Sequence, residues 1–239
     1  MPWLARPASW GVFSLGSDFL AAIKAVNRDR VAEMDRQGVT DYFAELGCGE
    51  TISTVAAFLR GAGRSDTLAH CQAVASRARA LAERFGVDVE GAVLAGSCHD
   101  LAAVVPHRQA VSVAEGLGLA PDPIERAVPI LLHGAIGAAV LRCRLGVTDA
   151  EVLDAVRYHT TSRPGAGPLE RVVFVADKIA LDPSSPVRDF VPAVEGAAER
   201  SLEEAALVYL EWVVTCGPRL GWTVHPRVQA AWAELSSRG

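Results

Sequence analysis

Apolar residues recur along most of the chain with the period of a helix. From Leu68 to Phe85 they return every three or four positions, and Gly86 follows. This pattern predicts an amphipathic helix with Ser65 or Asp66 as its N-cap and Gly86 at its end.

The same period predicts most of the remaining structure. Helices are expected over residues 17–36, 88–101, 129–146, 148–158, 168–181, 200–215 and 226–236. Thr148 and Glu151 have the spacing of a capping box, and a break is expected near Gly47 and Gly49. The best strand candidate, residues 172–175, is too short to be assigned by period, and its flanks continue at helical spacing. The predicted fold class is all-α.

Composition fits one large domain or a domain with a modest appendage. The chain has 239 residues, of which 50% are apolar and 21% charged, as in a globular protein with a sizeable core. The first 60 residues carry no recognisable chemistry. We therefore divide the chain into an N-terminal helical extension of unassigned role, residues 1–60, and a main domain, residues 61–239.

Charge and cysteine content exclude several classes of partner. The formal net charge is −5 without a long basic run, so duplex nucleic acid is not expected as a partner. Five cysteines without a CxxC pair argue against a disulfide framework or a cysteine-bound zinc. No stretch of about 20 uninterrupted apolar residues occurs and the N-terminus fits a signal peptide poorly, so we expect a cytoplasmic protein without a membrane partner. The sequence leaves the oligomeric state open, a homodimer included.

Candidate chemistry begins with three histidines in apolar surroundings. His99 precedes Asp100 near the end of a predicted helix, His70 lies within the preceding helix, and His133 lies in the segment PILLHGAIGAAVL. A buried imidazole needs a polar partner, so each is either a hydrogen-bonded core histidine or a metal ligand. Gly134 beside His133 would let another backbone or a ligand approach closely, as would Gly137.

Asp177 and the loop after His159 complete the candidate set. Asp177 has apolar neighbours on both sides, so its carboxylate must pair with a metal or an arginine; Lys178 is not expected to pair with it, because adjacent helix positions do not face each other. The loop beginning at His159 contains Thr160, Thr161, Ser162 and Arg163. It suits an oxyanion; the alternative is an ordinary helix-ending turn with threonine and serine as caps.

The ordered set of histidines and aspartates resembles the ligand pattern of the HD superfamily of metal-dependent phosphohydrolases. The segments LAERFGVDVEGAVLAGSCHDLA, ILLHGAIGA, VLDAVRYHTTSRPG and FVADKI are similar to those of its YqeK-type branch, the symmetrical bis(5'-nucleosyl)-tetraphosphatases. The similarity covers roughly residues 65–215. It implies an HD-domain helical bundle with an extra N-terminal helical segment.

The resemblance implies a centre with two divalent ions, iron foremost and otherwise manganese, cobalt or zinc. One ion would be held by His70, His99, Asp100 and Asp177, and the second by His133 and His159 with Asp100 as the bridge. Imidazole and carboxylate ligands suit these metals.

The implied reaction is phosphoanhydride hydrolysis by a metal-activated hydroxide. Asp100, Lys178 and Arg163 would form the catalytic set, and Thr160, Thr161, Arg163 and Lys178 would bind the substrate. That substrate would be a nucleotide or another small phosphorylated molecule, such as diadenosine tetraphosphate cut to two nucleoside diphosphates.

Three positions depart from the branch pattern. Thr67 and Leu68 replace an Arg-Tyr pair, and Ala103 replaces a lysine. The missing lysine keeps open a nucleotide-binding module with weak turnover. The ligand set alone also fits an HD-fold di-iron oxygenase acting on a small phosphonate or alcohol.

Overall fold

Every regular element that the structure describes is helical, which confirms the predicted all-α class. The computed structural model describes the chain except residues 1–40, 44–45, 47–49, 183–184, 186 and 239. The predicted helix over 17–36 and the break near Gly47 and Gly49 lie outside the described residues. Residues 42–239 form one compact unit, and the packing below is that of this unit.

The described part of the chain contains eleven α-helices and four 3-10 helices. The α-helices are α2 (Thr51–Gly61), α3 (Ser65–Phe85), α4 (Val89–Cys98), α5 (His107–Gly116), α6 (Pro123–Ala127), α7 (His133–Leu145), α8 (Ala150–Tyr158), α9 (Pro168–Ile179), α10 (Val191–Ala198), α11 (Leu202–Cys216) and α12 (Pro226–Ser236). The 3-10 helices are η1 (Asp41–Phe43), η2 (Leu101–Val104), η3 (Pro129–Leu132) and η4 (Gly217–Leu220).

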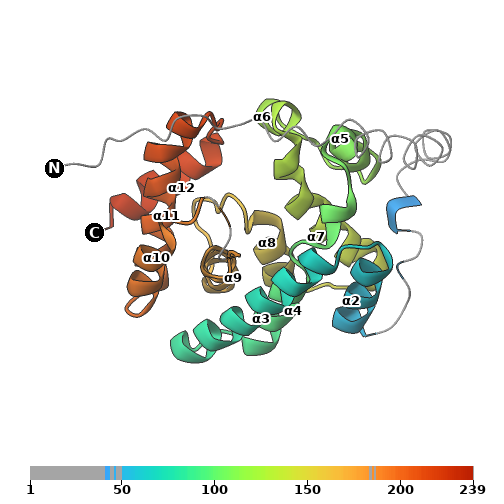
Figure 1. Cartoon of the computed structure of the whole chain (residues 1–239), viewed down its shortest axis with the longest axis horizontal. Coiled ribbons are helices and arrows are strands. Elements are labelled where there is room, and N and C mark those ends of the chain that lie inside the picture. Colours follow the sequence, from blue (N-terminus) through green and yellow to red (C-terminus); the bar gives the residue numbers. More distant parts are fainter. Residues whose placement is uncertain (1–40, 44–45, 47–49, 183–184, 186, 239) are drawn as a thin grey trace. The chain divides into compact units, whose positions relative to one another are not determined.

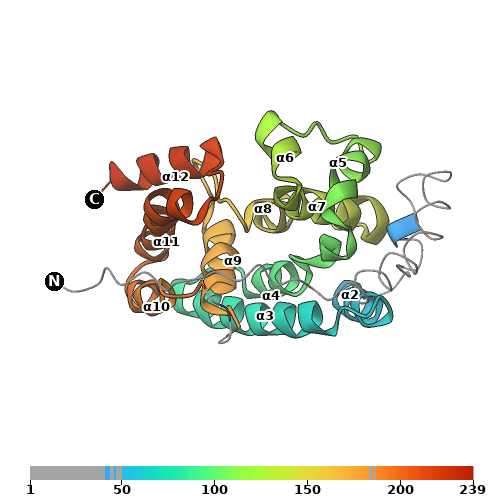
Figure 2. The ribbon, with the colours of Figure 1, turned by 45° about the horizontal axis from the view of Figure 1, so that its top comes forward.

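Helices α4, α8 and α9 form the centre of the bundle. The long helix α3 packs along α4 and α9, and α8 packs against α4, α7 and α9. Helices α10 and α12 contact α11, which also packs against α9, and α2 contacts α3 and α4. Figures 1 and 2 show α3 and α4 side by side, with α7 and α8 on one side of α9 and α10 to α12 on the other.

The ends of several helices differ from the predicted ones. Arg64, not Ser65 or Asp66, is the N-cap of α3, whereas Gly86 ends that helix with a positive φ of 66°, as predicted. The N-cap of α8 is Asp149, whose side chain accepts from two backbone amides, instead of Thr148. An aspartate one residue later competes successfully because its carboxylate accepts both hydrogen bonds.

Two predicted helices are interrupted where candidate residues lie. The helix expected over 88–101 ends at Cys98, so His99 follows its last turn. The helix expected to start at Pro129 begins instead with η3, and α7 starts at His133. These interruptions place the candidate side chains at helix ends, where they can face one another.

A close approach of α7 and α8 confirms the prediction for Gly134. A Cβ atom there would lie 2.7 Å from the carbonyl oxygen of Arg157 and 2.9 Å from that of Val156. The neighbour is therefore another backbone. At Gly137 the nearest atom would be 3.6 Å away, an ordinary contact.

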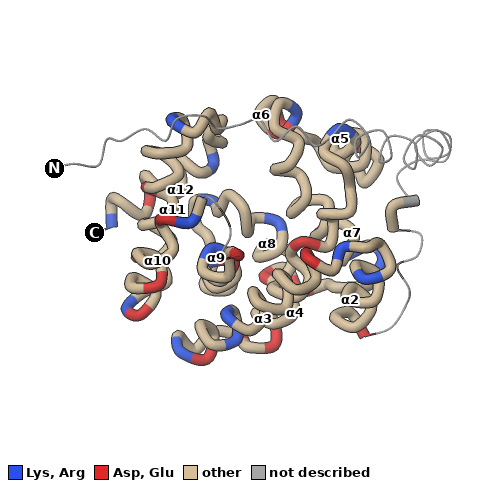
Figure 3. Tube along the Cα trace, viewed as in Figure 1, with Lys and Arg blue, Asp and Glu red and all other residues tan. Residues whose placement is uncertain are grey.

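Basic and acidic residues are interspersed along the described helices (Figure 3). Of these helices, none is long and apolar enough to cross a membrane.

Candidate metal centre

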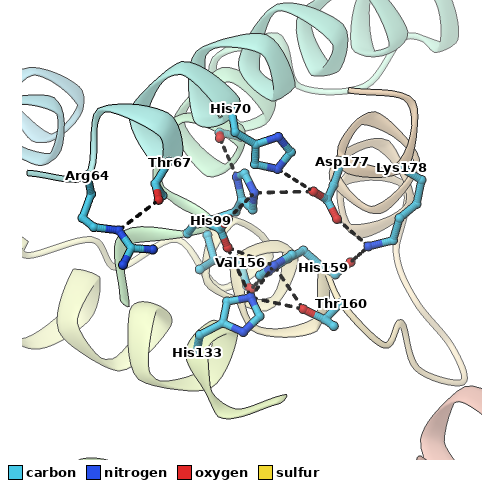
Figure 4. A network of polar contacts seen from close by, with 12 residues as sticks. Arg64, Thr67, His70, His99, His133, Val156, His159, Thr160, Asp177 and Lys178 are labelled. Carbon is cyan, nitrogen blue, oxygen red and sulfur yellow. Dashed lines mark hydrogen bonds and ion pairs between the residues drawn. The ribbon is translucent and has the colours of Figure 1, made fainter. Parts of the chain in front are cut away.

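Six residues from five segments of the chain converge at one place, and most of them lie at helix ends. They are His70 in the second turn of α3, His99 and Asp100 directly after α4, His133 at the start of α7, His159 directly after α8, and Asp177 in the last turn of α9. Figure 4 shows the four histidines and Asp177 facing a common centre.

Three of the imidazoles are oriented by a backbone carbonyl of the preceding turn. The Nδ1 of His99 lies 2.9 Å from the Gly96 oxygen, that of His133 lies 2.5 Å from the Ile130 oxygen, and that of His159 lies 2.7 Å from the Val156 oxygen. A carbonyl only accepts, so each Nδ1 carries the proton and donates it. Each Nε2 therefore presents a lone pair to the centre, the arrangement typical of metal-binding histidines.

The lone pairs of His133 and His159 face each other. Their Nε2 atoms are 2.9 Å apart, a distance at which two acceptors repel unless a proton or a cation lies between them. The Thr160 hydroxyl lies 3.3 Å from one Nε2 and 3.1 Å from the other, and it has a single proton to donate. The Oδ1 of Asp100 completes this group, 3.2 Å from the Nε2 of His133 and 3.6 Å from that of His159.

A second group forms around His99. Its Nε2 is fully buried and has no hydrogen-bond partner among the described residues, although Asp100 Oδ2 and Asp177 Oδ1 each lie 3.6 Å away. Asp177 Oδ1 also lies 2.9 Å from the Nε2 of His70. An unsatisfied buried nitrogen is costly, and a divalent cation between these atoms would satisfy it.

Asp100 joins the two groups. One set of atoms that could hold a metal comes from His70, His99 and Asp100, and another from Asp100, His133 and His159; in each set the atoms lie within 4.8 Å of one another. The two oxygens of Asp100 face different histidines. The residues present could therefore hold a divalent cation in each group, and Asp100 belongs to both groups.

Burial and the neighbouring charges shift the pKa values of several groups at the centre. Burial opposes ionisation, but the neighbouring His99 and the contacts with His133 and His159 hold the pKa of Asp100 well below its usual range. Burial disfavours the charged form of His133, but the neighbouring Asp100 raises its pKa. Burial lowers the pKa of His159 to about 4, so this imidazole stays neutral and available as a ligand.

Lys178 corrects one prediction from the sequence. It does pair with Asp177: its Nζ contacts Asp177 Oδ2 and donates to the His159 carbonyl oxygen at 3.2 Å. The argument from helix geometry failed because a lysine side chain is long enough to curl back to its neighbour. Burial disfavours the charged ammonium of Lys178, but Asp177 raises its pKa.

The surroundings of Lys178 are closed. The side chain is buried, and its Nζ lies 5.2 Å from the ring centre of Phe174 and 5.1 Å from that of Tyr209. Its contacts hold the Asp177 carboxylate in place. This environment favours a positioning role over the predicted contact with phosphate.

Arg163 is also held by carboxylates. Its Nε and Nη2 donate to Glu170 at 2.7 and 2.8 Å, and its Nη2 donates to Asp154 at 2.9 Å. The guanidinium also lies over the Tyr158 ring. Arg163 thus joins the loop after α8 to the first turn of α9, and none of these contacts connects it to the two groups of candidate ligands.

The two predicted threonines differ in their surroundings. Thr160 faces the Nε2 atoms of His133 and His159, as described above. Thr161 is buried, and its hydroxyl donates to the Ser162 carbonyl oxygen at 3.0 Å. Of the two, Thr160 is therefore the one placed to contact a substrate at the centre.

A third group of possible ligands, Asp122, Glu125 and His225, lies apart from the six. The Nδ1 of His225 accepts from the Arg227 amide at 2.9 Å, so its Nε2 carries the proton and donates to Asp122 at 2.8 Å. Asp122 also caps α6. These hydrogen bonds join the start of α6 to the start of α12 and give the group a structural role.

The carbonyls that orient the three histidines were not anticipated from the sequence. Each acceptor lies three residues before its histidine, at Gly96, Ile130 and Val156. The available signal was a histidine at the end of a helical turn, where a free carbonyl lies within reach of Nδ1.

Known proteins are similar to this chain in sequence and in fold. The profile of the HD domain matches residues 67–182. The symmetrical bis(5'-nucleosyl)-tetraphosphatase of Bacillus subtilis is 35% identical over 138 residues, which cover 58% of this chain and 72% of that protein. This chain belongs to the HD-domain family.

Further relatives of this HD-domain protein agree. A symmetrical bis(5'-nucleosyl)-tetraphosphatase of Halalkalibacterium halodurans is 30% identical over 168 residues, 70% of this chain and 87% of that protein. A crystal structure from Clostridium acetobutylicum, described as a predicted HD superfamily hydrolase involved in NAD metabolism, superposes with a TM-score of 0.74 at 26% identity, covering 81% of this chain and 100% of that one. The HD-domain protein is a phosphohydrolase, and its family implies divalent metal ions.

Proposed function

We propose that this HD-domain protein hydrolyses a dinucleoside polyphosphate, such as diadenosine tetraphosphate, to two nucleoside diphosphates. The observation that carries the proposal is the pair of ligand groups that share Asp100. The substrate class is supported by the names of the relatives in Bacillus subtilis and Halalkalibacterium halodurans. Two divalent ions, iron foremost, would be held by His70, His99, Asp100 and Asp177 and by His133 and His159.

Hydrolysis of the central anhydride bond accounts for the products. Water adds to one of the two inner phosphorus atoms, the bond from that phosphorus to the bridging oxygen breaks, and the second nucleoside diphosphate leaves. When bound, two divalent ions supply a water of lowered pKa and neutralise charge on the phosphoryl oxygens.

Four side chains at the centre have distinct roles in this reaction. Asp100 stays ionised and is shared between both groups, and Lys178 holds Asp177 in its orientation. The Thr160 hydroxyl lies 3.1 Å from the His159 Nε2, so it can hydrogen-bond a phosphoryl oxygen or a water beside that ligand. The buried His159 supplies a neutral imidazole.

The test combines metal analysis with product analysis. The purified protein is loaded with iron, manganese or cobalt, its metal content is measured, and the products from diadenosine tetraphosphate are separated by chromatography. Two ions per chain with ADP as sole product support the proposal. AMP with ATP contradicts symmetrical cleavage, oxygen consumption without ADP indicates the oxygenase, and tight binding without turnover indicates a nucleotide-binding module.

Variants locate the activity in the centre. His99→Ala or Asp100→Ala should lose metal and activity together, while circular dichroism remains helical. His225→Asn is the matched control, because it removes an imidazole from the structural group at α6 and should keep both ions. Retained activity in Asp100→Ala would overturn the assignment.

A further inference from the structure

The two basic residues expected to meet the phosphate charge are engaged elsewhere. The Lys178 ammonium is buried against Asp177, and the Arg163 guanidinium is paired with Glu170 and Asp154. A dinucleoside tetraphosphate carries several negative charges that must be met near the cleaved bond. The two proposed ions would meet part of that charge, and a further cationic side chain beside the centre would meet more of it.

A pocket of about 200 Å³ opens on the side of Asp100 and His133. Its other lining residues include Arg64, Ala103, His107 and Ile130. Among the described lining residues Arg64 is the one arginine, and no lysine is present. Figure 4 shows Arg64 on the opposite side of the histidines from Lys178.

The guanidinium of Arg64 is only weakly held by the protein. Its Nε lies 3.4 Å from the Thr67 hydroxyl and 4.0 Å from a carboxylate oxygen of Asp66, whose side chain is largely exposed. Neither Nη atom has a hydrogen-bond partner among the described residues. Both are free to donate to a ligand, and a guanidinium matches two phosphate oxygens at once.

We propose that Arg64 is a substrate-binding residue that holds the phosphate chain in the pocket beside Asp100 and His133. This inference rests on the proposed function and names a contact for that same site. A phosphate chain that reaches the Asp100 side of the centre enters the pocket that Arg64 lines. Ala103 lines it too and contributes only a methyl group, so Arg64 supplies the charge there.

The kinetic test uses Arg64→Gln in the metal-loaded enzyme. We expect kcat/KM for diadenosine tetraphosphate to fall roughly 10- to 100-fold, mainly through a higher KM, with unchanged metal content. Arg77→Gln is the control, because Arg77 lies on α3, the helix that Arg64 precedes as N-cap, but pairs with Glu195 at 3.8 Å. An unchanged KM in Arg64→Gln overturns the inference.

Two further measurements distinguish a lost phosphate contact from a folding defect, and failure of this inference from failure of the proposed function. The double variant Arg64→Gln with Ala103→Lys places an ammonium in the same pocket and should recover part of the lost affinity, which repair of a folding defect would not explain. If the wild-type chain does not hydrolyse diadenosine tetraphosphate, the proposed function fails. Calorimetric titration with ADP then decides on Arg64: binding at least tenfold weaker in Arg64→Gln supports it, and equal binding rejects it.

Discussion

Substitution of Gly134 by alanine tests whether the close approach of α7 and α8 sets the geometry of the metal centre. The new Cβ would lie 2.7 Å from the Arg157 carbonyl oxygen, whereas an ordinary contact begins at 3.4 Å. The two helices must therefore separate locally by about 0.7 Å. Since His133 precedes Gly134 and His159 follows Arg157 by two residues, the separation acts directly on these two candidate ligands.

The expected consequence is loss of one metal ion before loss of the fold. Metal–ligand distances tolerate changes of only about 0.2 Å, so the ion between His133 and His159 should bind poorly while the other remains. Overpacking of this kind also costs about 1–3 kcal/mol of folding free energy. Metal content per chain, activity and urea unfolding of Gly134→Ala measure the three effects.

Gly137→Ala is the matched control on the same helix. Its Cβ would meet its nearest neighbour at 3.6 Å, so both ions should remain, and stability should rise by roughly 0.5–1 kcal/mol because alanine favours the helix. If Gly134→Ala keeps two ions and full activity, the close approach does not control the centre and the reasoning is wrong.

Three further predictions concern the charges around the centre. Lys178→Met should destabilise the metal-free protein by about 3–5 kcal/mol in urea unfolding, because Asp177 is left buried without its partner; a change below about 1 kcal/mol would contradict the pairing. With the metal removed by a chelator, His159 should contribute about 3 kcal/mol of stability above pH 6.5 that is lost as the pH falls towards 4, because its pKa of about 4 in the folded chain lies below the unfolded value. The variant His159→Asn should lose less stability over that range. An identical loss in the variant would refute the assignment. Glu170→Gln should cost roughly 1.5–3 kcal/mol by weakening the bond with Arg163 while metal content stays the same, and thermal unfolding with elemental analysis checks both.

The helical class and the longest helices were predictable because their amphipathic period extends over many turns. Helices α2, α5, α6 and α10 were missed; α6 and α10 have only five and eight residues, and so short a segment shows little of the 3.6-residue period. The capping predictions failed at Ser65 and Thr148 because several polar residues compete for one helix end. Which of them wins depends on backbone geometry that the sequence does not display.

Convergence of the six candidate residues followed from the order of residue types and the resemblance, not from any single spacing. The structure brings all six together, and their roles as ligands stay a prediction. The pairing of the basic side chains with carboxylates was harder to predict from the sequence. Whether Lys178 or Arg163 is open to a ligand depends on carboxylates elsewhere in the fold, and Arg64 carried no signal except its position one helical turn before Thr67.

The carbonyl bonds to the three Nδ1 atoms leave the negative charge of the centre to its carboxylates. An imidazole that donates from Nδ1 is neutral or positive, so Asp100 and Asp177 supply all of that negative charge, and Lys178 already offsets part of it. Two divalent ions would reverse the local sign, giving a positive interior in a chain whose formal net charge is −5. The centre would then attract a polyanionic substrate only after the divalent ions have bound, so metal binding would precede substrate binding.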